Sequence, residues 1–350
     1  MGLHAYRADS RRILAALRAI LPPSASVTIV GTLDDGSTEL SVGPRTVRAK
    51  WLGNAWLGQV RGVLESPTLP DIVVARRMSP GGREALAKAK VSWVDETGEA
   101  EVALDSIIVS RSGRQPQREP TPPRWTPAVV AVAEALLCGV GATVTASSAA
   151  TGLSSGACTA ALKTLTDFKL LSARTARGRG SGRTVVDQQN LLEAYATAAS
   201  SLAPTLSVAV GVTWRDPLDG LADLGRSWTA TGIPWAATGM VAAAVLAPLL
   251  TGVGTAEVYV GARTIADLDG LARRSGLRPL PGGRLTLRPF PTAATEKLAT
   301  IQDGVAVAPW PRVFVDLRRT GVRGEEAAEH LREVMNARRT RANEGGPARG

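Results

Sequence analysis

Cysteine and histidine are scarce in this 350-residue sequence, which contains two of each. Cys138 and Cys158 both stand in apolar periodic segments, a placement that argues against a disulfide framework. His4 and His330 lie near opposite ends of the chain, so a zinc site of the usual Cys/His kind lacks ligands. Catalysis by a histidine-activated nucleophile is disfavoured for the same reason, and we expect no metal and no cofactor.

Long apolar runs are also missing. The stretch MGLHAYRADSRR at the start lacks the apolar core of a signal peptide, and the run MVAAAVLAPLL is too short and too interrupted by proline to span a bilayer. The glycine patterns of a P-loop or a dinucleotide-binding turn do not occur. These absences favour a cytoplasmic protein with no membrane partner.

What the sequence does contain is positive charge on a chain that is 44% hydrophobic, with a formal net charge of +10. Residues 111–183 hold ten basic and three acidic side chains, so this segment carries a net charge of +7. A basic protein is drawn to polyanions, of which nucleic acid and anionic membranes are the usual examples. The segment that holds the charge therefore decides the partner.

Changes in composition divide the chain. The stretch RSGRQPQREPTPPRWTP replaces the apolar periodicity found on both sides of it and is typical of a linker. We expect an α/β multi-domain protein with five segments: a small α/β domain at 1–110, a basic Pro-rich linker at 111–125, a winged helix-turn-helix at 126–187, a C-terminal α/β domain at 188–335 and a disordered tail at 336–350.

The two outer domains mix helices and strands. In the first, ILAALRAI predicts a helix, SVTIVG and TVRAKWLG predict strands around the turn DDGS, and Ser79 with Pro80 opens a second helix. In the last, LSVAVGV and AEVYVGA predict strands, and Thr264 and Gly276 bound a helix. The segment PWPRVFVDL predicts a strand or turn, followed by a helix that opens near Glu325.

The central segment changes to a helical period. Helices are predicted over TPAVVAVAEALLC, over the short TASSAATG and over SSGACTAALKTLTDFKLL. The strands LLSA and TVVD then flank the loop RTARGRGSGRT, which has four arginines and three glycines in eleven residues. Three helices followed by a two-stranded hairpin predict a winged helix-turn-helix with the arginine loop as its wing.

In such a fold the third helix enters the major groove of double-stranded DNA, and the wing reaches phosphates or the minor groove. Hydroxyl groups at the start of this helix can meet phosphates or base edges, but without Arg, Asn or Gln the direct base readout is modest. The alternatives are a solvated hairpin without a partner and a helix-turn-helix that contacts only protein. The candidate DNA-binding residues are Ser154, Ser155, Thr159, Lys163, Arg174, Arg177, Arg179, Arg183 and Arg124.

Two acidic patterns were considered as enzyme sites. A metal-dependent nuclease of the PD-(D/E)xK type needs one carboxylate and then an acid and a lysine two residues apart on the next strand. Pro70-Asp71 supplies the first part, but VSWVDETGEAEV, which contains Asp95, has no lysine after any acid. Asp267 and Asp269 imitate the acid pair of nucleotidyltransferases, but they lie on a predicted helix. We therefore expect no enzyme and no catalytic residues.

Four segments, spread over residues 65–335, resemble AbiEi-type regulators, the antitoxins of type IV toxin-antitoxin systems. LPDIVVARRMSPGGREALAKAKVSWVDETGEAEV matches with Asp95 and Gly98, although Glu99 stands where the family has asparagine. SSGACTAALKTLTDFKLL resembles the winged-helix segment of the family. The other two segments, TGMVAAAVLAPLLTGVGTAEVYV and WPRVFVDLRRTGVRGEEAAEHL, match at Gly239, Ala242, Ala243, Asp316, Arg323 and Ala327, while Met240 departs from the family's glycine.

The resemblance implies a DNA-binding regulator that represses its own operon and whose third domain counters a nucleotidyltransferase-like toxin. It also implies that the first domain is a degenerate, inactive restriction-endonuclease-like fold. Two other functions stay open at this point: a nuclease targeted by the winged helix, and an interaction protein that neutralises its partner without binding DNA. A homodimer is also open, because winged helices often bind paired half-sites but the sequence shows no heptads.

Overall fold

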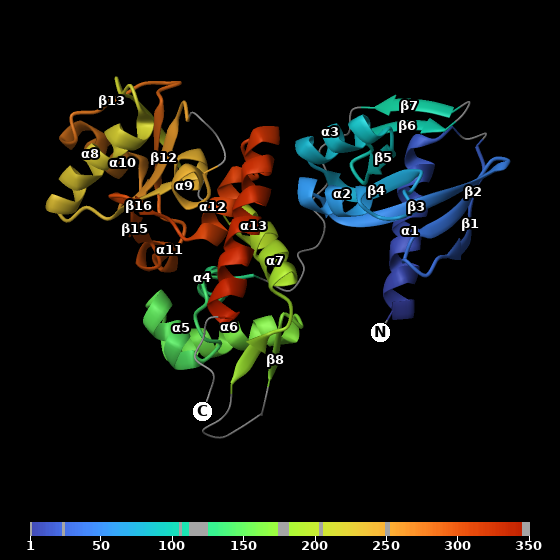
Figure 1. Ribbon diagram of the computed structural model, residues 1–350, viewed down its shortest axis with the longest axis horizontal. Coiled ribbons are helices and arrows are strands. Elements are labelled where there is room, and N and C mark those ends of the chain that lie inside the picture. The colour runs from blue at the N-terminus through green and yellow to red at the C-terminus, as the bar shows by residue number, and fades with distance from the viewer. Residues whose placement is uncertain are drawn as a thin grey trace. The chain divides into compact units, whose positions relative to one another are not determined.

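The computed structural model describes residues 2–22, 25–104, 107–111, 125–173, 182–202, 206–248 and 253–344, which form a mixed α/β protein. The chain folds into two compact units. Unit 1 comprises residues 1–121 and 321–326, and unit 2 comprises residues 122–320 and 327–350. Within the described residues, no helix is both long and apolar enough to cross a membrane. Figure 1 shows the elements of both units.

Unit 1 is a seven-stranded sheet with helices on both faces. Its strands follow the order β1-β2-β3-β4-β5-β6-β7, with β3, β4 and β5 parallel and the other neighbours antiparallel. The elements of unit 1 are α1 (Gly2–Ile20), β1 (Val27–Thr32), β2 (Thr38–Val42), β3 (Arg45–Ala55), α2 (Leu57–Leu64), β4 (Ile72–Met78), α3 (Pro80–Ala89), β5 (Ser92–Asp95), β6 (Ala100–Leu104) and β7 (Ile107–Arg111).

Two apolar layers hold this sheet. The first lies beneath α1, where Ile13 and Leu17 pack on Leu40 and Val47. The second lies on the other face, beneath α2 and α3, and is rich in alanine and valine. The central strand β4 is buried at its first four positions, as expected for a strand covered on both faces.

One carboxylate completes unit 1 from a distant part of the sequence. Residues 321–326 include the first turn of α13 (Val322–Glu344), and the Glu325 side chain is only 1% exposed. It accepts hydrogen bonds from the Ser79 hydroxyl at 2.7 Å and from the backbone N–H groups of Gly81 at 3.2 Å and Leu57 at 3.3 Å. One carboxylate thus satisfies donors at the first turns of both α2 and α3.

Unit 2 begins with three helices and a hairpin, in the order that the sequence predicts. We call residues 125–187 the helix-hairpin module. Its register pairs Leu171 with Val185 and Ala173 with Arg183. The elements are α4 (Pro127–Leu137), α5 (Val144–Thr151), α6 (Ser155–Asp167), β8 (Leu171–Ala173) and β9 (Arg183–Val185).

The rest of unit 2 is a second mixed sheet, in the order β13-β10-β14-β12-β11-β16-β15. Helices α8 and α10 pack on its strands, as do α9 and α12. The elements are α7 (Gln188–Ser201), β10 (Val208–Gly211), α8 (Pro217–Ala230), β11 (Trp235–Thr238), α9 (Gly239–Leu246), β12 (Ala256–Val260), α10 (Ile265–Arg274), β13 (Arg278–Pro279), β14 (Leu285–Pro289), α11 (Ala293–Lys297), β15 (Thr300–Gln302), β16 (Val305–Val307), α12 (Trp310–Leu317) and α13.

The module and the second sheet share one apolar core, so the expected domain boundary at residue 187 does not separate two compact units. The reason lies in α4, whose nine residues from Val129 to Leu137 are all buried. This helix contacts α5 and α6 of the module and also α7, α11 and α12. A helix that is apolar on every side needs neighbours on every side.

Other differences from the sequence predictions are local. Strand β2 and helix α2 were not predicted, and PWPRVFVDL forms the helix α12 instead of a strand or turn. The sequence predicts a disordered tail from residue 336. This prediction is wrong for residues 336–344, because α13 continues to Glu344. Cys158 is buried, and Cys138 is exposed at the end of α4.

Candidate nucleic-acid interface

Helix α6 has one buried and one exposed face. The buried face holds Cys158, Ala161, Leu162 and Leu165, which belong to the core of unit 2. Ser154 caps the helix, because its hydroxyl accepts a hydrogen bond from the Ala157 N–H at 3.3 Å. The apolar spacing therefore fixes which side of α6 stays available to a partner.

The exposed face of α6 carries the predicted residues Ser155, Thr159 and Lys163, together with Gly156 and Ala160. The Thr159 hydroxyl donates to the Ser155 carbonyl at 2.8 Å, which leaves its oxygen lone pairs directed outward to accept. Small side chains let another molecule approach the helix backbone closely. This face is therefore small and polar, with hydroxyl groups available to a partner.

Lys163 forms a surface ion pair within α6. Its Nζ lies 2.7 Å from an Asp167 carboxylate oxygen, and the two side chains are 72% and 57% exposed. An exposed pair of this kind contributes little to stability, so the lysine is free to exchange its partner for a phosphate.

The turn before α6 is tightly made. Gly152 ends α5 in the left-handed region, with φ at 73°. The buried Thr151 hydroxyl donates to the Ser147 carbonyl at 2.7 Å and accepts from the Leu153 N–H at 3.2 Å. These contacts set the angle at which α6 leaves α5.

The hairpin follows directly after α6. The hydroxyls of Ser172 and Thr184 lie 2.8 Å apart across the two strands. Arg183 stands in β9 at the last described pair before the loop. The other predicted arginines, at positions 124, 174, 177 and 179, lie outside the described residues.

Basic charge is unevenly distributed in the module. Residues 125–173 hold only four charged side chains, namely Glu134, Lys163, Asp167 and Lys169. Helix α5 and the turn after it hold none. The strong positive charge of this segment therefore belongs to the linker before α4 and the loop after β8.

A buried network of charged and polar groups joins α4, α7 and α12 to the second sheet. Arg312 and Asp316, both on α12, form an ion pair with an Nη2 to Oδ1 distance of 2.5 Å and side-chain exposures of 2% and 6%. Asp316 also accepts hydrogen bonds from the hydroxyls of Thr238 at 2.6 Å and Tyr259 at 2.5 Å. In α4, Glu134 accepts a hydrogen bond from the Tyr195 hydroxyl.

The pKa values of the two buried carboxyl groups, Glu134 and Asp316, are shifted in opposite directions. Burial raises the pKa of Glu134 above its ordinary value, and the Tyr195 hydrogen bond and the Arg312 charge offset only part of this effect. Burial also acts on Asp316, but Arg312 and the hydrogen-bonding hydroxyls outweigh it and lower the pKa of that carboxyl. The core of unit 2 therefore favours the ionised form of Asp316 and disfavours the ionised form of Glu134.

Sequence reasoning did not find this network. Two signals in the sequence were available: a single acid, Glu134, in the otherwise apolar run PAVVAVAEALL, and Arg312 and Asp316 at helical spacing. The resemblance pointed to Asp316 without a role. Its contacts make it a structural residue that holds α12 against β11 and β12.

The acids considered for a nuclease have local structural partners. Asp71, just before β4, accepts from the Arg48 backbone N–H at 2.8 Å. Asp95, at the end of β5, accepts from the N–H and hydroxyl of Thr97 and from the Met78 N–H. Both act as turn and strand-end acids.

A closer match to the nuclease layout is formed by the β1–β2 turn together with strand β3. Asp35 precedes β2, and Arg48 and Lys50 lie two residues apart on β3, so Arg48 stands where the layout requires an acid. Arg48 pairs with Asp35 at 2.7 Å, and Lys50 donates to the Asp35 carbonyl. Burial raises the Asp35 pKa, but the hydrogen bonds from Ser37 and Arg48 outweigh it and hold that pKa well below its ordinary value. Among the described residues, no three Asp, Glu, His or Cys side chains are grouped to hold a metal.

The acid pair on α10 is part of a helix cap. The Asp267 carboxylate accepts from the N–H groups of Arg263 at 3.0 Å and Thr264 at 2.9 Å, while the Thr264 hydroxyl accepts from the Asp267 N–H. This is a capping box, so Asp267 serves the helix start that the sequence placed at Thr264.

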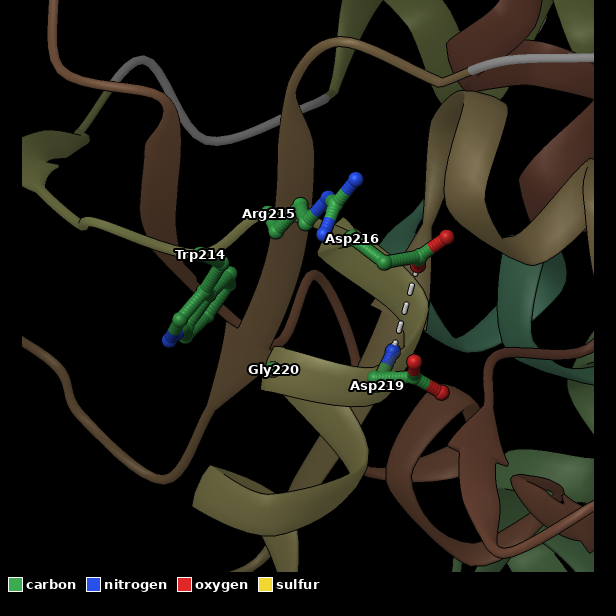
Figure 2. A pocket seen from close by; sticks show the side chains of 5 residues that line it. All are labelled: Trp214, Arg215, Asp216, Asp219 and Gly220. Atoms are coloured by element: carbon green, nitrogen blue, oxygen red, sulfur yellow. Dashed lines mark hydrogen bonds between the residues drawn. The ribbon is translucent and has the colours of Figure 1, made fainter.

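A hollow of about 490 Å³ lies at the start of α8. Figure 2 shows the residues that line it, which are Trp214, Arg215, Asp216, Asp219 and Gly220. Asp216 caps the helix and accepts from the Leu218 N–H at 2.7 Å. The Trp214 ring packs so closely on Gly220 that a Cβ there would lie 2.2 Å from the ring. These side chains stabilise the loop before α8.

No known protein family matches the chain, and no curated protein or solved structure is significantly similar to it. The functional argument therefore rests on the sequence and on the geometry of each unit.

Proposed function

We propose that the helix-hairpin module is a winged helix-turn-helix that binds double-stranded DNA, with α6 in the major groove and the arginine loop on phosphates or in the minor groove. The observation that carries this proposal is the exposed face of α6. It is small and hydroxyl-rich, it begins at a capped tight turn, and the hairpin with the basic loop follows it.

The biological role that we propose is transcriptional regulation of the antitoxin type, with repression of the protein's own operon. The order of the four segments that resemble AbiEi-type regulators supports it. The second sheet of unit 2 would then contact a nucleotidyltransferase-like toxin. Cytoplasmic location and action without catalysis belong to the same proposal.

A nuclease is the less favoured alternative. The β1–β2 turn and strand β3 of unit 1 supply a carboxylate and a lysine in the required order, but Arg48 replaces the second acid and pairs with the first. A restriction-endonuclease-like ancestry of unit 1 is consistent with this replacement and is part of the proposal.

Two matched lysines test the DNA-binding face. Lys163 in α6 and Lys88 in α3 are 72% and 73% exposed, and each pairs at 2.7 Å with an acid one helical turn away. We expect Lys163→Ala to weaken binding to the protein's own upstream DNA and to reduce the salt slope by about 0.9, the value for one phosphate contact. Lys88→Ala should leave both unchanged.

Equal effects of the two substitutions would mean that charge alone drives binding and would remove α6 from the interface. A joint replacement of Arg177, Arg179 and Arg183 tests the wing in the same assay. Unchanged affinity and slope in that variant would contradict the wing assignment.

A further inference from the structure

Helix α11, which follows strand β14 of the second sheet, places Lys297 at the turn before α6. This short helix packs against α4 and α5 and is anchored by the buried side chains of Ala294 and Thr295. An ideal Cβ placed on Gly152 would lie 2.6 Å from Nζ of Lys297 and 2.8 Å from its Cε. The lysine therefore lies across the glycine that separates α5 from α6.

The position of this lysine matters because of what surrounds it. Gly152 is two residues before Ser154, the cap of α6, so the two Cα atoms are at most about 7 Å apart. The module supplies no charged side chain of its own on α5 or on the turn. Lys297 and its neighbour Glu296 are both exposed, and in the part of the chain that the structure describes no ion pair joins Lys297 to an acid.

A helix whose first turn enters the major groove has DNA phosphates on both sides of it. In the sequence, the arginine loop follows the C-terminal end of α6. The turn before α6, by contrast, contains no basic residue of the module. Hydroxyls and backbone N–H groups at the start of α6 can contact a phosphate, but a lysine or arginine also neutralises its charge and releases counterions. At this turn, such a residue has to come from outside the module.

We propose that Lys297 contacts a DNA phosphate beside the start of α6, so that the DNA-binding surface includes a residue from outside the helix-hairpin module. This inference rests on the proposed DNA-binding function. The packing of α11 on α4 and α5 would then also serve DNA binding, because it positions the backbone of Lys297 beside the start of α6.

Lys297 also lies near the C-terminal end of α5, where a cation stabilises a helix through its dipole. The two roles give different results. Loss of a helix-dipole contact lowers the melting temperature and leaves the salt slope of DNA binding unchanged, whereas loss of a phosphate contact reduces that slope.

The test compares Lys297→Met, Lys297→Arg and Arg273→Met in the full chain. Arg273 is a matched control, because it is an exposed basic residue near the end of α10, which packs on the β10, β13 and β14 side of the second sheet. Binding to a fluorescent duplex of the protein's upstream DNA is measured over a salt series, together with the melting temperature of each protein.

We expect Lys297→Met to reduce the slope of log affinity against log salt by about 0.9, and Lys297→Arg to restore it. Arg273→Met should match the unmodified protein. An unchanged slope in Lys297→Met, with DNA binding intact in the unmodified protein, overturns this inference and leaves the proposed function standing. Absence of DNA binding in the unmodified protein overturns both.

Discussion

Helices α4 and α6 are neighbours of similar length in the same module, yet they have opposite surfaces. Every residue of α4 from Val129 to Leu137 is buried, whereas α6 buries only Cys158, Ala161, Leu162 and Leu165. Helix α4 joins the module to the second sheet, and α6 leaves one face exposed. The comparison teaches that the helix proposed to read DNA is held by a neighbour whose own sequence shows no binding residue.

One alanine in each helix provides the strongest test of this difference. Ala133 in α4 is fully buried, so Ala133→Asp places an unpaired charge in the core and should unfold unit 2. Ala160 in α6 is exposed, so Ala160→Asp should change the free energy of unfolding by less than about 0.5 kcal/mol but repel DNA. Urea unfolding and a gel-shift assay measure the two effects. A folded Ala133→Asp protein, or one with Ala160→Asp that binds DNA normally, would contradict the comparison.

The next largest effect is expected from the buried ion pair behind α4. Asp316→Ala leaves the Arg312 guanidinium buried without its carboxylate and should cost about 3–5 kcal/mol of unfolding free energy. A double variant, Arg312→Met with Asp316→Leu, removes both charges and should recover most of that loss. Because the module shares the same core, its melting should shift with that of the sheet. Independent melting of the two parts would show that α4 does not couple them.

The pH dependence of unit 2 sharpens the account of α4. Since the folded pKa of Glu134 is raised, its contribution to stability is present below the unfolded pKa and is lost as pH rises through the folded value. Asp316 acts in the opposite sense, since its folded pKa is lowered, and its contribution is lost as pH falls through that value. Glu134→Gln should therefore be more stable relative to the unmodified protein at higher pH than at low pH. Parallel stability curves for the two proteins would argue against a raised pKa of Glu134.

The smallest effect is expected at the turn between α5 and α6. Gly152→Ala forces a side chain into a left-handed conformation, with φ at 73°, and should cost about 1 kcal/mol. Gly152→Asn should cost less, because asparagine tolerates this conformation. Thermal melting separates the two variants. Equal costs would mean that space, not backbone conformation, makes this position a glycine.

Much of the module could be predicted from the sequence, because its signals are local. Thr126 and Pro127 open α4, Ser154 caps α6, and the Arg/Gly loop separates two short apolar strands. The apolar spacing of α6 also identified its exposed face. The sequence could not show that the segments before and after residue 187 form one unit. That result depends on the apolar residues of both segments packing into one core.

The missed elements depend on tertiary contacts. Helix α12 contains VFV, a run of β-branched and aromatic residues that favours a strand, but Pro311 in its first turn and the Arg312–Asp316 pair stabilise a helix inside unit 2. Strand β2 is a five-residue segment that becomes a strand through pairing on both edges. No sequence pattern marks Lys297 as a candidate binding residue, because its position beside Gly152 results from the packing of α11.

The central claim is that the chain binds DNA through its helix-hairpin module in a sequence-dependent way. The most direct measurement is a gel-shift of the purified full chain on its own upstream DNA and on an unrelated fragment of equal length, over a salt series. The account predicts tighter binding to the upstream fragment and an affinity that falls steeply with salt for both. Equal affinity for the two fragments would reduce the module to a phosphate clamp, and no binding to either would contradict the account.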